Sequence, residues 1–307
     1  MTPLFLLGAP KCATTSLYEQ LARHPQLSAP SVKEPGYFSR SGIRPDVRAR
    51  TPHVQSFDAY LALFDQRNDK IRAWCDGSTS YLRSPEALQA IRAKFPDARA
   101  IAVVRDPVDL VSSYYTFLRH ERWENAPTLE EAWNAQEARR EGVGIPDAAR
   151  RPDSLVYADV AMLGSQVETA KRVFGASLLV FTVDDLRSDL QRVSRVIQEH
   201  AGLDPLDLGA LPQSNPARQA NSERLNALVK DPPEWLAKAA SGLKARLGVT
   251  SLGIRRKVER ANSTPVRREL AVETRDRLRA FFSADVALLS SILHRDLRAE
   301  WGWTDTA

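Results

Sequence analysis

Short apolar runs alternate with amphipathic stretches along the chain up to about residue 200. Residues 4–8, 99–104 and 178–183 are mostly apolar, as is typical of strands buried on both faces of a parallel sheet. Apolar positions at helical spacing predict helices at residues 14–24, 56–65, 85–94, 108–121, 128–140 and 154–174. Strands that alternate with helices predict an α/β fold, with a central, mostly parallel sheet flanked by helices.

Length and composition are those of one globular domain. We expect residues 1–307 to form a single domain, with an α/β core over about 1–200 and a mostly helical part over about 201–307. No apolar run approaches the ~20 residues of a membrane span, and residues 4–7 are too few for a signal peptide. Only Cys12 and Cys75 are present, which argues against a disulfide framework and favours a cytoplasmic location.

Positive charge is concentrated late in the chain. The formal net charge is +5, and from residue 218 onward 17 Lys and Arg residues face 11 Asp and Glu residues. Residues 255–260 are the densest basic stretch. A solvated helix face and a surface for an anionic partner both agree with this pattern. No nucleic-acid-binding motif accompanies the basic residues, so we expect no nucleic-acid partner.

The first apolar run leads into a short loop with one lysine and then into hydroxyl residues that open a helix. Residues 10–17 read P-K-C-A-T-T-S-L. The N–H groups at a helix N-terminus, together with the charge of Lys11, suit a phosphate or sulfate group. This loop is not a Walker A loop, in which lysine stands directly before the hydroxyl residue. Because alanine disfavours positive φ, we expect Ala13 to have negative φ. Cys12 is either a reactive thiol or a buried small side chain.

A second polar segment follows the strand at 99–104. Residues 105–115 read R-D-P-V-D-L-V-S-S-Y-Y, in which Asp106 is a suitable N-cap and Pro107 a suitable first helical residue. Arg105 then lies at the carboxyl end of a strand, as Lys11 does, and open α/β sheets bind ligands at this edge. The sequence therefore predicts that both cations reach one ligand.

These two segments, in this order, resemble the sulfotransferases that use 3′-phosphoadenosine 5′-phosphosulfate (PAPS), in particular bacterial members similar to the heparan sulfate enzymes. K-E-P-G-Y-F at residues 33–38 and D-G-S-T-S-Y-L at residues 76–82 extend the likeness, although Gly77 stands where lysine is common, and residues 281–289 resemble the closing helix. The resemblance implies a P-loop-like fold and metal-independent transfer of a sulfuryl group from PAPS. The expected acceptor is a hydroxyl or amine of a small molecule, lipid or carbohydrate.

The resemblance also implies roles for single residues. Lys11 would stabilise the leaving group and Glu34 would be the base, which requires reach to the acceptor and a pKa raised by burial. Arg105 and Ser113 would hold the 3′-phosphate, and a late basic segment containing Arg255 and Arg256, or else Arg218, would close over it. The expected donor-binding residues are Lys11, Ala13, Thr14, Thr15, Ser16, Arg105, Ser113, Arg255 and Arg256.

Two other functions agree with the same residues. One is an ATP-dependent, kinase-like P-loop enzyme, in which Asp184 or Asp185 would hold Mg²⁺, and the other is a non-catalytic nucleotide-binding protein. His53 and His120 are alternative candidates for the base. The candidates for shaping the acceptor pocket are Trp123, Tyr157 and residues 128–140. The pattern does not identify the acceptor or the oligomeric state.

Overall fold

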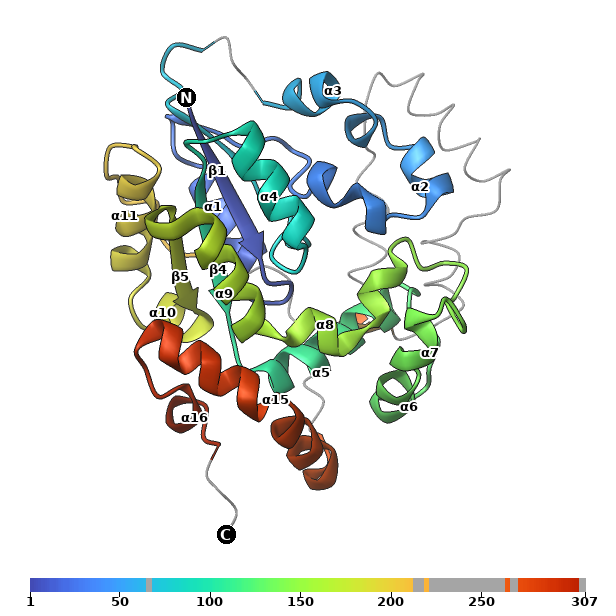
Figure 1. Cartoon of the computed structure of the whole chain (residues 1–307). Helices are drawn as coiled ribbons and strands as arrows, with labels where there is room; N and C mark the ends of the chain where they lie inside the picture. Colours follow the sequence, from blue (N-terminus) through green and yellow to red (C-terminus); the bar gives the residue numbers. More distant parts are fainter. Residues whose placement is uncertain (65–67, 212–217, 221–262, 266–269, 304–307) are drawn as a thin grey trace.

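The structure is a computed structural model that describes residues 1–64, 68–211, 218–220, 263–265 and 270–303 (Figure 1). At its centre is a five-stranded sheet in the order β2-β3-β1-β4-β5, in which every pairing is parallel. The predicted α/β class is confirmed, and β2 and β3 add to the three strands that the apolar runs predict. The strands are β1 (Thr2–Gly8), β2 (Leu27–Ser28), β3 (Ala73–Asp76), β4 (Arg99–Val104) and β5 (Leu178–Thr182).

Helices cover both faces of this sheet. In Figure 1, α4 and α9 lie in front of the strands and α1 lies behind them, while α15 packs along α9. The α-helices are α1 (Thr14–Leu21), α2 (Pro45–Ala49), α3 (Phe57–Leu61), α4 (Pro85–Lys94), α5 (Pro107–His120), α6 (Leu129–Asn134), α7 (Gln136–Arg140), α8 (Tyr157–Ala161), α9 (Leu163–Phe174), α10 (Val183–Ser188), α11 (Leu190–His200), α15 (Val272–Leu293) and α16 (Leu297–Glu300). The 3₁₀ helices are η1 (Tyr37–Gly42), η2 (Pro52–Val54), η3 (Pro152–Leu155) and η4 (Gly175–Ser177).

Two long predicted helices are divided. The pattern over 128–140 forms α6 and α7, which meet at Ala135. The pattern over 154–174 forms η3, α8 and α9, and Met162 leaves the helical region with ψ of 66° between α8 and α9. Apolar periodicity continues across both breaks because each short helix buries its own apolar face in the same core.

Late in the chain, the described residues include α15, α16 and a short antiparallel pair, β6 (Arg218–Ala220) with β7 (Ser263–Pro265). Strand β6 lies against α5. Within the described ranges, no helix combines the length and the apolar character that a membrane crossing needs.

The sheet determines where the functional loops meet. Residues 4–7 of β1 are fully buried, as expected for a central strand. Strands β3 and β4 flank β1, and all three run in the same direction. The loops that leave their carboxyl ends therefore lie side by side at one edge of the sheet.

Candidate active site

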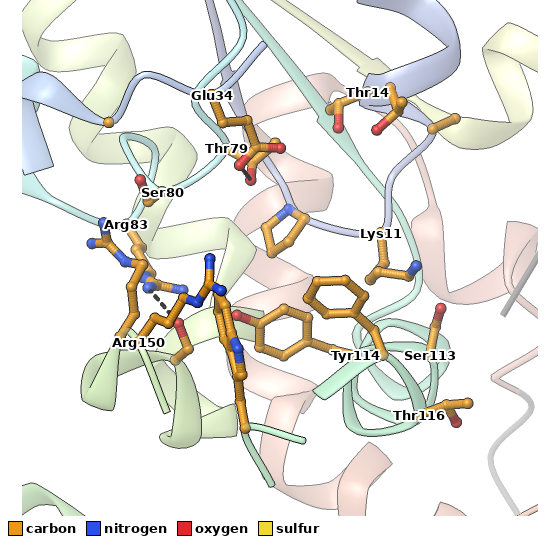
Figure 2. Close-up of a pocket in the computed structure, with 18 of the residues that line it drawn as sticks. Lys11, Thr14, Glu34, Thr79, Ser80, Arg83, Ser113, Tyr114, Thr116 and Arg150 are labelled. Carbon is orange, nitrogen blue, oxygen red and sulfur yellow. Dashed lines mark hydrogen bonds between the residues drawn. The ribbon is translucent and has the colours of Figure 1, made fainter. Parts of the chain in front are cut away.

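A cavity of about 1290 Å³ opens at this edge of the sheet. Its walls are the loop after β1, the segment around Glu34, the loop after β3, the first turns of α5 and the residues just before and within η3 (Figure 2). Pockets for a single drug-sized ligand typically measure about 300–1,000 Å³. The cavity is therefore large enough for two ligands side by side.

The loop between β1 and α1 forms one wall with residues Pro10, Lys11, Ala13, Thr14, Thr15 and Ser16. Helix α1 begins at Thr14, and no side chain caps its first N–H groups, which are the groups that bind anions at a helix N-terminus. The expectation of negative φ at Ala13 is wrong, because Ala13 has φ of 58° and ψ of 11°, and Lys11 also has positive φ. The tight turn requires the left-handed conformation, which costs a non-glycine residue about 1–2 kcal/mol.

Lys11 and Arg105 meet in this wall. One guanidinium nitrogen of Arg105 donates to the main-chain oxygen of Lys11 at 3.1 Å, and another pairs with Asp109 at 2.7 Å. The Lys11 ammonium lies over the ring of Phe117, 5.0 Å from its centroid. Burial lowers the pKa of Lys11, and the nearby charge of Arg105 lowers it further. The two sequence segments, 94 positions apart, are thus joined directly at one site.

Helix α5 supplies the floor below Lys11. Asp106 caps this helix by accepting the N–H of Val108 at 2.7 Å, and Pro107 is its first residue, as the sequence predicts. Ser113 lines the cavity two turns later, and Figure 2 shows it on the same side of the cavity as Lys11. Five other residues of this helix also line the cavity: Asp109, Ser112, Tyr114, Thr116 and Phe117.

Glu34 also reaches the cavity, but its carboxylate is held by two neighbours and is not buried. Lys33 pairs with Oε1 at 2.6 Å, and the Thr79 hydroxyl donates to Oε2 at 3.1 Å (Figure 2). The Glu34 side chain is 47% exposed, so the burial expected of a base is absent here. Both carboxylate oxygens nevertheless have a fixed partner, which holds the group in one orientation at the cavity wall.

A buried carboxylate fixes the loop that carries Thr79. Asp76, fully buried at the end of β3, accepts hydrogen bonds from the N–H and hydroxyl of Ser78 and from the hydroxyls of Tyr60 and Tyr81, at 2.6–2.9 Å. Burial raises the pKa of Asp76 to about 6, although these hydrogen bonds act in the opposite direction. The sequence around Asp76 gives no sign of this role, because the network depends on how the chain folds back to bring Tyr60 to Asp76.

Burial and position decide the expectations for Cys12, Trp123 and Tyr157. Cys12 is fully buried, and burial raises the pKa of its thiol to about 12, so the structural role is confirmed and a reactive thiolate is not. Trp123 lines the cavity as expected. Tyr157 does not, because it is buried in the core and donates to Glu124 at 2.7 Å.

The two candidate histidines and Asp185 also differ in whether they are available to a ligand in the cavity. His53 lines the cavity, and burial lowers its pKa, whereas His120 is not among the lining residues. Asp185 accepts the N–H of Thr182 in a capping box and pairs with Arg295 at 2.9 Å. Its carboxylate is thus committed to capping and ion pairing, which weakens the interpretation as a magnesium ligand.

Some cavity residues carry no sequence signal. Arg83, Arg150 and Arg151 lie in loops with no recognisable pattern, and only the tertiary structure brings them to one wall. Two expected donor-binding residues, Arg255 and Arg256, lie outside the described residues. Arg218 is in β6, the strand that lies against the helix of Ser113.

The fold and this loop define a class. A parallel sheet in the order β2-β3-β1-β4-β5, with an anion-binding type of loop after its central strand, is that of a P-loop-like α/β protein. Residues 3–143 match the model of the sulfotransferase family. Human carbohydrate sulfotransferase 15 is 27% identical, and the mouse protein of that name 26%; each match covers 37% of this chain and 26% of that protein.

A solved structure agrees over a longer stretch. The crystal structure of a sulfotransferase from Alicyclobacillus acidocaldarius matches with a TM-score of 0.69 and covers 97% of this chain and 98% of that chain, at 24% sequence identity, which shows a common fold. The chain is therefore similar to the sulfotransferase family over residues 3–143, which is nearly half of its length. It spans only about a quarter of the length of the two mammalian proteins that it matches.

Proposed function

We propose that this protein transfers a sulfuryl group from PAPS to a hydroxyl or amine of an acceptor by in-line displacement at sulfur. The observation that carries the proposal is one cavity, large enough for two ligands, that contains Lys11, the N-terminus of α1, Arg105, Ser113 and Glu34. A donor bound against the first four would leave space beside Glu34 for an acceptor.

The donor half suits a nucleotide with two anionic ends. The uncapped N–H groups of α1, with the hydroxyls of Thr14, Thr15 and Ser16, would bind a 5′-phosphosulfate. The guanidinium of Arg105 and the hydroxyl of Ser113 would bind the 3′-phosphate, for which a planar fork and a neutral donor are well suited. PAPS would supply the activated sulfuryl group and the leaving group, 3′,5′-ADP.

The protein's own part in the reaction is proton transfer and charge stabilisation. Glu34 would accept the proton of the acceptor, with Lys33 and Thr79 holding its carboxylate in place. Lys11 would stabilise the negative charge that grows on the bridging oxygen as the bond to sulfur breaks. Because this charge develops mainly in the transition state, we expect Lys11→Ala to lower turnover by on the order of 10²–10³.

Calorimetric titration tests the donor half. Full-length protein is titrated with 3′,5′-ADP in the presence of EDTA and, separately, with Mg-ATP. We expect metal-independent binding of 3′,5′-ADP that is at least tenfold weaker in Arg105→Ala, since a charge-assisted hydrogen bond contributes about 1.5–3 kcal/mol. Arg172→Ala, on the surface of α9, is the control and should bind normally. Binding of Mg-ATP alone would reject the proposal in favour of phosphoryl transfer.

Turnover with labelled PAPS tests the catalytic half. A panel of hydroxyl and amine acceptors is screened, and Glu34→Gln is then compared with the wild-type protein on any acceptor that is sulfated. Glutamine keeps the shape but cannot accept the proton, so transfer should fall at least a hundredfold while 3′,5′-ADP binds as before. Tight donor binding without transfer to any acceptor would favour a non-catalytic nucleotide-binding protein.

A further inference from the structure

Three arginine side chains line one end of the cavity: Arg83, Arg150 and Arg151. Figure 2 shows Arg83 and Arg150 on the side of the cavity opposite to Lys11 and Ser113. Arg83 comes from the loop after β3, and the other two come from the segment before η3. This arginine cluster is therefore separate from the cations of the proposed donor half.

One carboxylate serves two of these arginines. Asp153 Oδ2 lies 3.0 Å from a nitrogen of Arg83 and 3.1 Å from a nitrogen of Arg151, whose side chains are only 9% and 14% exposed. Although burial alone would raise the pKa of Asp153, the two guanidinium groups hold it below its ordinary value, so Asp153 contributes a full negative charge. Arg150 makes no ion pair with any described residue. The three arginines and the carboxylate of Asp153 thus have two uncompensated positive charges.

Two members of the cluster, Arg83 and Arg151, are held in place before any ligand binds. Arg151 donates to the main-chain oxygen of Ser39 at 3.0 Å, and a side chain at Gly42 would collide with Asp153 and Arg151. Positive charge in a largely buried place is costly unless an anion accompanies it. Two fixed arginines that share one carboxylate, with a third arginine exposed beside them, are therefore the expected form of an anion-binding site.

A short chain of contacts links the cluster to the proposed base. The hydroxyls of Ser39 and Ser80 lie 2.7 Å apart, and Ser80 follows Thr79, which holds Glu34. An anionic group bound by the arginines would thus be fixed relative to the Glu34 carboxylate. This arrangement is what orientation of an acceptor requires.

We propose that the arginine cluster binds an oxyanion of the acceptor, so that the molecule receiving the sulfuryl group is a hydroxyl or amine compound that also carries a carboxylate or phosphate. The inference rests on the proposed function, because it assigns the second half of the same cavity. Guanidinium forks bind both oxyanions through paired hydrogen bonds.

Three probes on one molecular frame test the proposal: glucose, glucuronate and glucose 6-phosphate. Each is titrated calorimetrically into full-length protein saturated with 3′,5′-ADP, at an ionic strength of about 0.15 M so that unspecific attraction is screened. We expect at least one anionic probe to bind tenfold or more tightly than glucose. The stronger of the two anions identifies the acceptor group as carboxylate or phosphate. Equal binding of all three probes, or binding of none, overturns the proposal.

Two variants that each remove one positive charge make the test specific. Arg150→Gln should reduce the preference for the anionic probe to within about twofold. It should fold normally, since Arg150 is exposed and makes no ion pair with the residues that the structure describes. Arg172→Gln, on the surface of α9 and outside the cavity, should keep the preference, and Arg150→Lys should restore part of it. A preference that survives in Arg150→Gln also overturns the proposal.

The same data separate this inference from the proposed function. Failure of the wild-type protein to bind 3′,5′-ADP would reject the donor assignment. The comparison of Arg150→Gln with Arg172→Gln on the anionic probes, repeated without 3′,5′-ADP, does not depend on that result and would still decide the role of the cluster.

Discussion

The buried carboxyl of Asp76 should make the stability of the protein depend on pH in a defined direction. Burial raises the pKa of Asp76 in the folded protein to about 6, against about 3.8 in an unfolded chain. A raised folded-state pKa adds stability that is fully present below the unfolded value and is lost as the pH rises through the folded value. The shift of about two units corresponds to about 3 kcal/mol.

The measurement is the free energy of unfolding in urea at pH 5, 6 and 7, followed by tryptophan fluorescence, for the wild-type protein and Asp76→Asn. Asparagine does not titrate, so the difference between the two proteins isolates Asp76 from all other groups. We expect the wild-type value to fall relative to the variant by roughly 1–1.5 kcal/mol between pH 5 and pH 7, which is nearly half of the full effect. A difference that stays constant within about 0.3 kcal/mol would refute the reasoning, because the carboxyl would then titrate alike in both states.

Three further predictions concern backbone strain, positioning and a buried ion pair. Ala13→Gly should raise the unfolding free energy by up to about 1 kcal/mol, because glycine adopts positive φ without strain. Ala90→Gly, at an exposed position of α4, should instead lower it by about 1 kcal/mol. Thermal denaturation measures both changes, and the same sign for both would contradict this prediction. Thr79→Val should lower transfer about tenfold with unchanged 3′,5′-ADP affinity, and an equal loss of nucleotide binding would show a merely structural role. Arg139→Leu should cost about 3–5 kcal/mol in urea unfolding, since it leaves the buried Glu124 carboxylate without its ion-pair partner. A loss below about 1 kcal/mol would argue against the pair.

Local patterns were sufficient to predict the fold class and to place the two segments that contain Lys11 and Arg105 at one edge of the sheet. Apolar runs identify buried strands because a parallel strand is covered on both faces, and β1, β4 and β5 follow those runs closely. The start of α5 follows from the capping preferences of Asp106 and Pro107, which act within a few residues. Two strands were not predicted from the pattern, since β2 and β3 have two and four residues. Elements so short contain too little periodicity to recognise.

The prediction of negative φ at Ala13 was wrong for a different reason. Intrinsic preference argues for negative φ, but the turn that joins β1 to α1 requires the opposite, and tertiary packing provides the free energy that overrides a preference of about 1–2 kcal/mol. The same limit applies to Glu34, whose exposure and hydrogen-bond partners depend on how the loop after β3 is placed.

By itself, the sequence determined that the chain forms an α/β sheet with Lys11 and Arg105 at its carboxyl edge, because strand burial and helix capping depend on neighbouring residues. Only the tertiary structure decided that Thr79 holds Glu34 and that Arg83 and Arg151, 68 positions apart, share Asp153. Contacts of this kind join loops that no periodic pattern describes. They exist because the order of the strands brings the ends of distant segments to one cavity.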